Sequence, residues 1–117
     1  ILLYESPDAF AERAGDGAAA YWSAWAAYFG ALEERTQSGA CLKAPQTGAL
    51  VRVDAAGRQV QDGPYADTKE QLGGFAIIEA DSLEDALGWA ERCPAASSGA
   101  VEVRPVQPMA EIREMQS

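Results

Sequence analysis

The first forty residues pair a short apolar segment with a long amphipathic one. Ile1–Tyr4 is apolar throughout and predicts a strand. From Gly17 to about Ser38, apolar side chains recur at spacings of three and four, which predicts a helix that Gly39 ends. Four large side chains form the predicted core side of this helix: Trp22, Trp25, Phe29 and Leu32.

Two further aromatic residues, Tyr21 and Tyr28, lie on a flank of the same helix. This makes the aromatic surface wider than one core face usually needs. Two interpretations stay open. The surface is either a wide buried face, or one that also contacts a second subunit.

The middle of the chain predicts three short strands: Ala40–Lys43, Ala49–Val53 and Arg58–Asp62. The last two are joined by Asp54–Gly57, whose glycine is typical of a tight hairpin. Arg52 and Arg58 alternate with valines, so we expect both on the exposed side of the hairpin.

The second half begins with a dense cluster of turn residues. Asp67 and Glu70 have the spacing of a capping box, which predicts a short helical turn that Gly73 and Gly74 end. A strand (Phe75–Ala80) follows, then a helix that begins at Ser82 and ends at Cys93–Pro94, then a strand (Val101–Arg104). The predicted core side of the helix is Leu83, Ala86, Leu87 and Ala90.

Without the hairpin, the predicted order is βαββαβ, the order of ferredoxin-like α+β folds. We therefore expect one domain over residues 1–106 and a tail over 107–117. Both helices should cover one face of an antiparallel sheet. The other face would stay bare, and an uncovered apolar sheet face normally finds a partner.

Composition narrows the possible partners. The formal charge is −9, which argues against binding to nucleic acid or to an anionic membrane. There is no histidine, so Cys41 and Cys93 cannot join a Cys/His zinc site, and we expect neither metal nor cofactor. Both cysteines are expected to be buried in a protein of the reducing cytoplasm.

One stretch resembles a known family. It runs from Asp62 to Val106 and reads DGPYADTKEQLGGFAIIEADSLEDALGWAERCPAASSGAVEVRPV. This is similar to the hallmark segment of the DGPF-domain branch of the YCII-related family, with Tyr65 where the family usually has phenylalanine. The upstream helix and hairpin extend the resemblance to residues 1–106.

The resemblance implies a homodimer of the dimeric α+β-barrel type, in which two bare sheet faces pack together. It implies a biochemical role that is largely unassigned, in bacterial proteins often linked with extracytoplasmic-function sigma factors. The wider family is thought to use a His–Asp pair in a pocket. This chain has no histidine, so that pair is not carried over.

The candidate site residues lie in two places. Asp62 is our candidate general base, with Tyr65 and Lys69 as ligand-binding neighbours; the alternative is ordinary turn chemistry. Glu102 and Arg104 should leave the last strand on the bare face, where they either bind a ligand or pair with each other.

Three functions stay open at this stage. The chain is a small-molecule binder or weak enzyme with a pocket at the dimer sheet face, a protein-interaction module serving a sigma-factor system, or a structural subunit. The first is favoured because a barrel dimer encloses a cleft.

Overall fold

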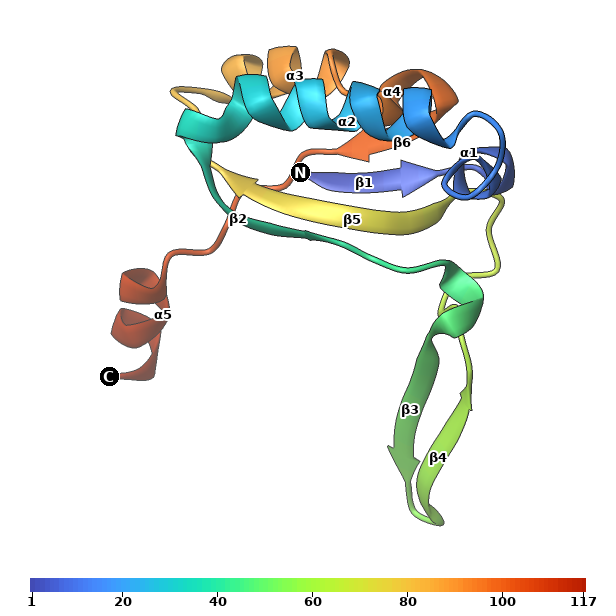
Figure 1. Cartoon of the computed structure of the whole chain (residues 1–117). Helices are drawn as coiled ribbons and strands as arrows, with labels where there is room; N and C mark the ends of the chain where they lie inside the picture. Colours follow the sequence, from blue (N-terminus) through green and yellow to red (C-terminus); the bar gives the residue numbers. More distant parts are fainter.

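The computed structural model describes residues 1–117 as a sheet with helices on one face and a hairpin that projects away from it (Figure 1). The strands are β1 (Leu2–Glu5), β2 (Thr36–Cys41), β3 (Ala49–Asp54), β4 (Gly57–Asp62), β5 (Gln71–Ile78) and β6 (Gly99–Glu102). The helices are α1 (Pro7–Glu12), α2 (Ala18–Leu32), α3 (Leu83–Glu91), α4 (Ala95–Ser98) and α5 (Met109–Gln116), with single 3₁₀ turns η1 (Glu33–Arg35) and η2 (Pro45–Thr47).

The four-stranded sheet has the order β2-β5-β1-β6, and every neighbouring pair is antiparallel. Helices α2, α3 and α4 lie on one of its faces (Figure 1). The α+β class and the antiparallel sheet are thus confirmed, and the strand order is compatible with the expected ferredoxin-like fold. No helix is long and apolar enough to cross a membrane.

The core lies between α2 and the sheet. Leu32 is fully buried, and Trp25 and Tyr28 are buried beside it. The Tyr28 hydroxyl donates a hydrogen bond of 2.9 Å to the backbone oxygen of Trp89, which ties α2 to α3. The remaining members of the core cluster are Leu3, Cys93 and Ala95.

Three large residues predicted in the core are exposed instead. Trp22 is 42% exposed, Leu83 is 60% exposed and Leu87 is 41% exposed. On α3 the buried positions are Ala86 and Ala90, both with small side chains. The helix therefore presents a narrow alanine strip to the core, and the leucines beside that strip remain partly exposed.

The predicted end of the first helix is also wrong. Helix α2 stops at Leu32, and the chain has entered β2 by Thr36. Gly39 lies inside that strand. A Cβ there would come within 2.6 Å of the backbone oxygen of Phe75, so the glycine permits close strand approach rather than ending a helix.

The capping-box interpretation of Asp67 and Glu70 fails as well, because no helix forms there. The side-chain amide of Gln71 instead donates hydrogen bonds to the backbone oxygens of Ala66 and Thr68, both at 2.7 Å, and closes the loop. Gln71 itself begins β5, so the two following glycines lie inside a strand and end no helix.

The hairpin forms as predicted, and its turn requires glycine because Gly57 has φ of 110°. Its register corrects one detail. Arg58 pairs with Val53 and Val60 pairs with Val51, so Arg58 shares the valine face instead of lying opposite it. That face is solvent-exposed, and both the hairpin and α5 project from the sheet on the side away from the helices (Figure 1).

The face of the sheet turned away from the helices carries no helix in this chain (Figure 1). Leu3 and Ala76 are buried on the helix side, so strand alternation places their neighbours on the open face. The larger apolar side chains on that open face are Leu2, Tyr4, Leu72, Phe75 and Ile77.

We predict that Leu32→Ala lowers the free energy of unfolding by about 2–5 kcal/mol, because it opens a cavity in the core. Leu83→Ala should change it by less than about 0.5 kcal/mol, because that side chain is exposed. Urea denaturation at one protein concentration measures both. Equal losses would contradict the packing of α3 described above.

Candidate functional site

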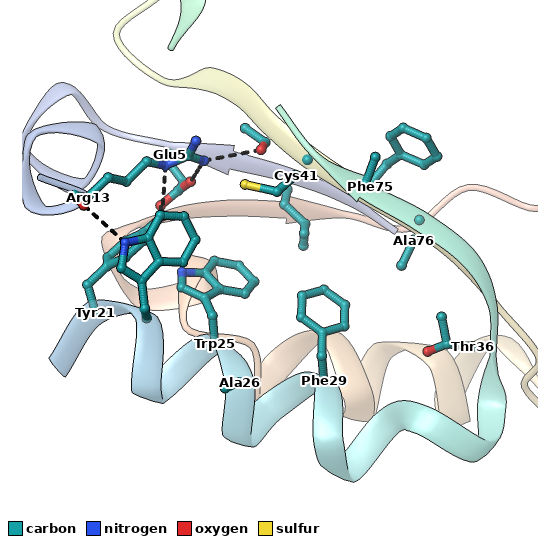
Figure 2. A pocket seen from close by; sticks show the side chains of 16 residues that line it. Glu5, Arg13, Tyr21, Trp25, Ala26, Phe29, Thr36, Cys41, Phe75 and Ala76 are labelled. Atoms are coloured by element: carbon teal, nitrogen blue, oxygen red, sulfur yellow. Dashed lines mark hydrogen bonds and ion pairs between the residues drawn. The ribbon is translucent and has the colours of Figure 1, made fainter. Parts of the chain in front are cut away.

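A cavity of about 450 Å³ lies between α2 and the sheet, a volume suited to a small molecule (Figure 2). Trp25, Ala26 and Phe29 reach it from α2, and Cys41 reaches it from the edge strand β2. Cys41 is exposed there, which corrects the expectation that both cysteines are buried; only Cys93 is.

The cavity has one polar end, a network built on Glu5. Glu5 is 2% exposed, and its carboxylate lies 2.7 Å from the guanidinium of Arg13. Its second oxygen accepts a hydrogen bond from the hydroxyl of Tyr21 at 2.5 Å. Arg13 also donates to the Tyr21 oxygen and to the backbone oxygens of Leu42 and Gly73. Both oxygens of Glu5 and all three nitrogens of the Arg13 guanidinium thus take part in hydrogen bonds, as burial of an ion pair requires.

Local sequence explains how these groups meet. Alternation along β1 turns Glu5 to the helix side, the same side as Leu3. The Ser6 hydroxyl then accepts a hydrogen bond from the amide of Ala9, which starts α1 directly after the strand. Arg13 caps the end of that six-residue helix and so folds back to within reach of the carboxylate.

The walls of the cavity are apolar. Trp25 and Phe29 lie with ring centroids 5.7 Å apart and planes inclined by only 18°, and both point from α2 toward the sheet (Figure 2). Opposite them, Gly39, Gly73 and Gly74 leave the strands without side chains. The pairing of β1 with β5 shifts its register here, because Leu3 pairs with Gly74 whereas Tyr4 pairs with Leu72.

The polar end carries no net charge. Burial of the phenol, followed by its hydrogen bond to Glu5, raises the pKa of Tyr21 to about 12, so it stays neutral at physiological pH. Burial alone would lower the pKa of Arg13, but hydrogen bonds to Glu5 and Tyr21 outweigh burial and raise it. One carboxylate therefore faces one guanidinium beside a neutral hydroxyl.

This arrangement is better suited to holding a ligand than to moving a proton. Both oxygens of Glu5 already accept hydrogen bonds. No group of three or more cysteine or carboxylate side chains is placed to hold a metal ion. Cys93 lies outside the cavity, and burial raises the pKa of its thiol to about 11, so it stays protonated.

The residues predicted for the site lie elsewhere. Asp62 is exposed at the end of β4, and its carboxylate forms no ion pair and does not line the cavity beneath α2. Tyr65 is 75% exposed, and the guanidinium of Arg52 lies 5.5 Å from the centre of its ring. Lys69 is exposed in the following loop. The catalytic role of Asp62 and the binding roles of its two neighbours stay predictions.

The second predicted group lies near the open face of the sheet. Glu102 pairs with Leu2 across β1 and accepts a hydrogen bond of 3.1 Å from the hydroxyl of Tyr4. Arg104 follows the end of β6 and lines a separate groove with Val103. Glu102 and Arg104 form no ion pair with each other, and their binding roles also stay predictions.

Comparison with known proteins places the chain in a family. The model of the YCII-related domain matches residues 1–110. The chain belongs to the YCII-related family. The DGPF branch within that family stays a prediction, carried by Asp62–Tyr65.

A curated relative of this YCII-related chain is "Uncharacterized protein R00369" of Rhizobium meliloti (strain 1021). The two are 46% identical over 65 residues, which is 53% of this chain and 52% of the relative. The chain therefore spans about half the length of that protein.

Sequence reasoning missed the three polar residues of this YCII-related site. Strand alternation could have identified Glu5, because it lies on the same inward side as Leu3 in an otherwise apolar strand. A carboxylate there needs a buried partner. No local pattern identifies Arg13 or Tyr21 as that partner, because their approach depends on how α1 and α2 fold back.

We predict that breaking the buried pair is costly. Arg13→Met should lower the free energy of unfolding by about 3 kcal/mol, because it leaves the Glu5 carboxylate buried without its cation. The double variant Glu5→Leu/Arg13→Met should lose less free energy of unfolding than the two single variants lose together. We expect the difference to exceed about 1 kcal/mol. Chemical denaturation of the four proteins gives this cycle.

A matched control is Arg35→Met on the surface. Arg35 also lies 2.7 Å from a carboxylate, that of Asp85, but the two side chains are 36% and 27% exposed. Arg35→Met should therefore lower the free energy of unfolding much less than Arg13→Met does. Additive single variants, or a control that loses as much, would contradict the role given to Glu5 and Arg13.

Proposed function

We propose that this YCII-related domain is a small-molecule-binding protein whose ligand occupies the cavity beneath α2. The observation that carries the proposal is the convergence of Glu5, Arg13 and Tyr21 at one end of an otherwise apolar cavity. Ligand sites typically combine apolar walls with a few fixed polar groups. This moves the binding site predicted at the bare sheet face to the helix side of the sheet.

We further propose that the domain is a homodimer of the α+β-barrel type, joined through the open sheet face. The accessible surface of 8287 Å² exceeds the roughly 6,100 Å² expected for a monomer of this mass. The radius of gyration is 16.8 Å, against about 13 Å for a compact chain of this length. Apolar side chains on the open face, including Phe75 and Ile77, support the same interface.

A protein-interaction module is the second candidate function. The exposed valine face of the projecting hairpin supports it, with Val51 61% exposed and Val53 76% exposed. In a homodimer this face would meet the second copy. In an interaction module, such as the sigma-factor partner that the resemblance implies, it would stay free for another protein.

The cavity proposal is tested by closing the cavity from α2. Ala26 lines the cavity and is exposed, whereas its neighbour Ala27 is exposed and does not line it. Fragments that bind the wild type should shift the indole N–H resonances of Trp22 and Trp25, and leave that of Trp89 unchanged. Ala26→Leu should weaken these fragments about tenfold or more through steric exclusion, while Ala27→Leu should not.

The fragment set should contain neutral, anionic and cationic compounds, both planar and saturated. Fragments that shift all three indole resonances alike, or that bind Ala26→Leu as well as the wild type, would contradict a site beneath α2.

The dimer is tested by sedimentation. The wild type should have twice the chain mass of 12.4 kDa at micromolar concentration. Ile77→Glu places a charge on the open face and should give the single-chain mass, because an unpaired buried charge opposes association. Leu83→Glu, at an exposed position on α3, should remain dimeric. A monomeric wild type would overturn the dimer.

A further inference from the structure

The charge at the polar end of the cavity limits the ligand. Glu5 and Arg13 neutralise each other at 2.7 Å, and Tyr21 is uncharged. An anionic or cationic ligand would lose its hydration inside an apolar cavity without gaining an unpaired opposite charge. The cavity therefore favours a ligand with no net charge.

The remaining hydrogen-bonding capacity is specific. A guanidinium has five N–H donors. Those of Arg13 make four hydrogen bonds, to Tyr21, Leu42, Glu5 and Gly73, which leaves one donor on the nitrogen that binds Leu42. Each carboxylate oxygen of Glu5 accepts one bond and retains a free lone pair. A single neutral group that donates to the carboxylate and accepts from the guanidinium satisfies both, and a hydroxyl does this.

Among the other polar side chains in the lining, the indole N–H of Trp25 makes no hydrogen bond within the chain, and it can donate but not accept. The hydroxyl of Thr36 is engaged with the backbone oxygen of Leu32 at 3.0 Å. The indole N–H of Trp22 is engaged with the backbone oxygen of Arg13 at 3.0 Å. The thiol of Cys41 is a weak donor and acceptor. The polar group of a ligand is thus directed to the Glu5 end.

The shape of the cavity favours a flat ligand. On one side lie the rings of Trp25 and Phe29, whose planes are nearly parallel to each other. On the other side, Gly39, Gly73 and Gly74 expose strand backbone with no side chains. A planar ring can stack on the aromatic side and approach the glycine side closely, which a puckered saturated ring of the same size does less well.

The geometry points to a neutral, planar ring compound bearing a hydroxyl group, a phenol or naphthol in chemical class, as the ligand of this cavity. The inference rests on the proposed small-molecule binding and specifies its ligand class. The hydroxyl donates to Glu5 and accepts from Arg13, and the ring lies between the aromatic side chains of α2 and the glycines of the strands.

The test compares four probes on the wild-type protein: β-naphthol, naphthalene, β-naphthoate and the saturated alcohol decahydro-β-naphthol. Titrations are followed through the indole N–H resonances of Trp22 and Trp25, with Trp89 as the internal control outside the cavity. β-Naphthol should bind about five- to tenfold more tightly than naphthalene, the effect of one or two net hydrogen bonds. β-Naphthoate and the saturated alcohol should bind more weakly than β-naphthol.

Glu5→Gln should reduce the preference for β-naphthol over naphthalene, because the charged acceptor is lost. If that variant does not fold, the wild-type ratios decide alone. Equal binding of all four probes at Trp22 and Trp25 would overturn the ligand class and leave small-molecule binding intact. Tighter binding of β-naphthoate would also overturn the ligand class. The absence of any shift with all four would overturn the ligand class, and failure of the fragment set as well would overturn the proposed function.

Discussion

The buried carboxylate of Glu5 is the constraint on which this end of the molecule depends. An ionised group with 2% exposure is tolerated only beside a cation and hydrogen-bond donors. Arg13 meets that demand, and the same guanidinium binds the backbone oxygens of Leu42 and Gly73. One ion pair thereby holds β1, α1, the end of β2 and the start of β5 in fixed positions, with Tyr21 adding α2.

The cavity follows from how this network is placed. Its hydrogen bonds hold the N-terminal half of α2 through Tyr21, while the helix packs against the core through Tyr28 and Leu32 further along. Between these two attachments, aromatic rings of α2 line one side of the cavity. Glycines of the strands line the other side. The cavity of about 450 Å³ that remains between them is the proposed ligand site.

The parts of the fold that depend on neighbouring residues could be predicted from the sequence. The hairpin follows from its glycine turn, and α3 starts where Ser82 accepts a hydrogen bond from the amide of Asp85. The parts that depend on distant residues could not. Gly73 and Gly74 look like a helix stop in isolation, and their function as a strand surface beneath α2 exists only once the sheet has formed.

The same limit applies to the candidate site. The hallmark motif directed attention to Asp62, which is solvent-exposed at the end of β4. The cavity instead uses residues from segments that carry no motif, and Arg13 meets Gly73 across a separation of 60 residues. Hydrophobic patterning shows which side of a strand faces inward, but it does not show which side chains from other elements arrive there.

Gly73 also ties the evolution of the cavity lining to the Glu5–Arg13 ion pair. A Cβ at this position would lie 2.6 Å from a carboxylate oxygen of Glu5 and 2.9 Å from a guanidinium nitrogen of Arg13. Any lineage that replaced this glycine would have to displace the ion pair. A homologue with a larger residue at this position should therefore also differ at Glu5 or Arg13, and its cavity would have a different polar end.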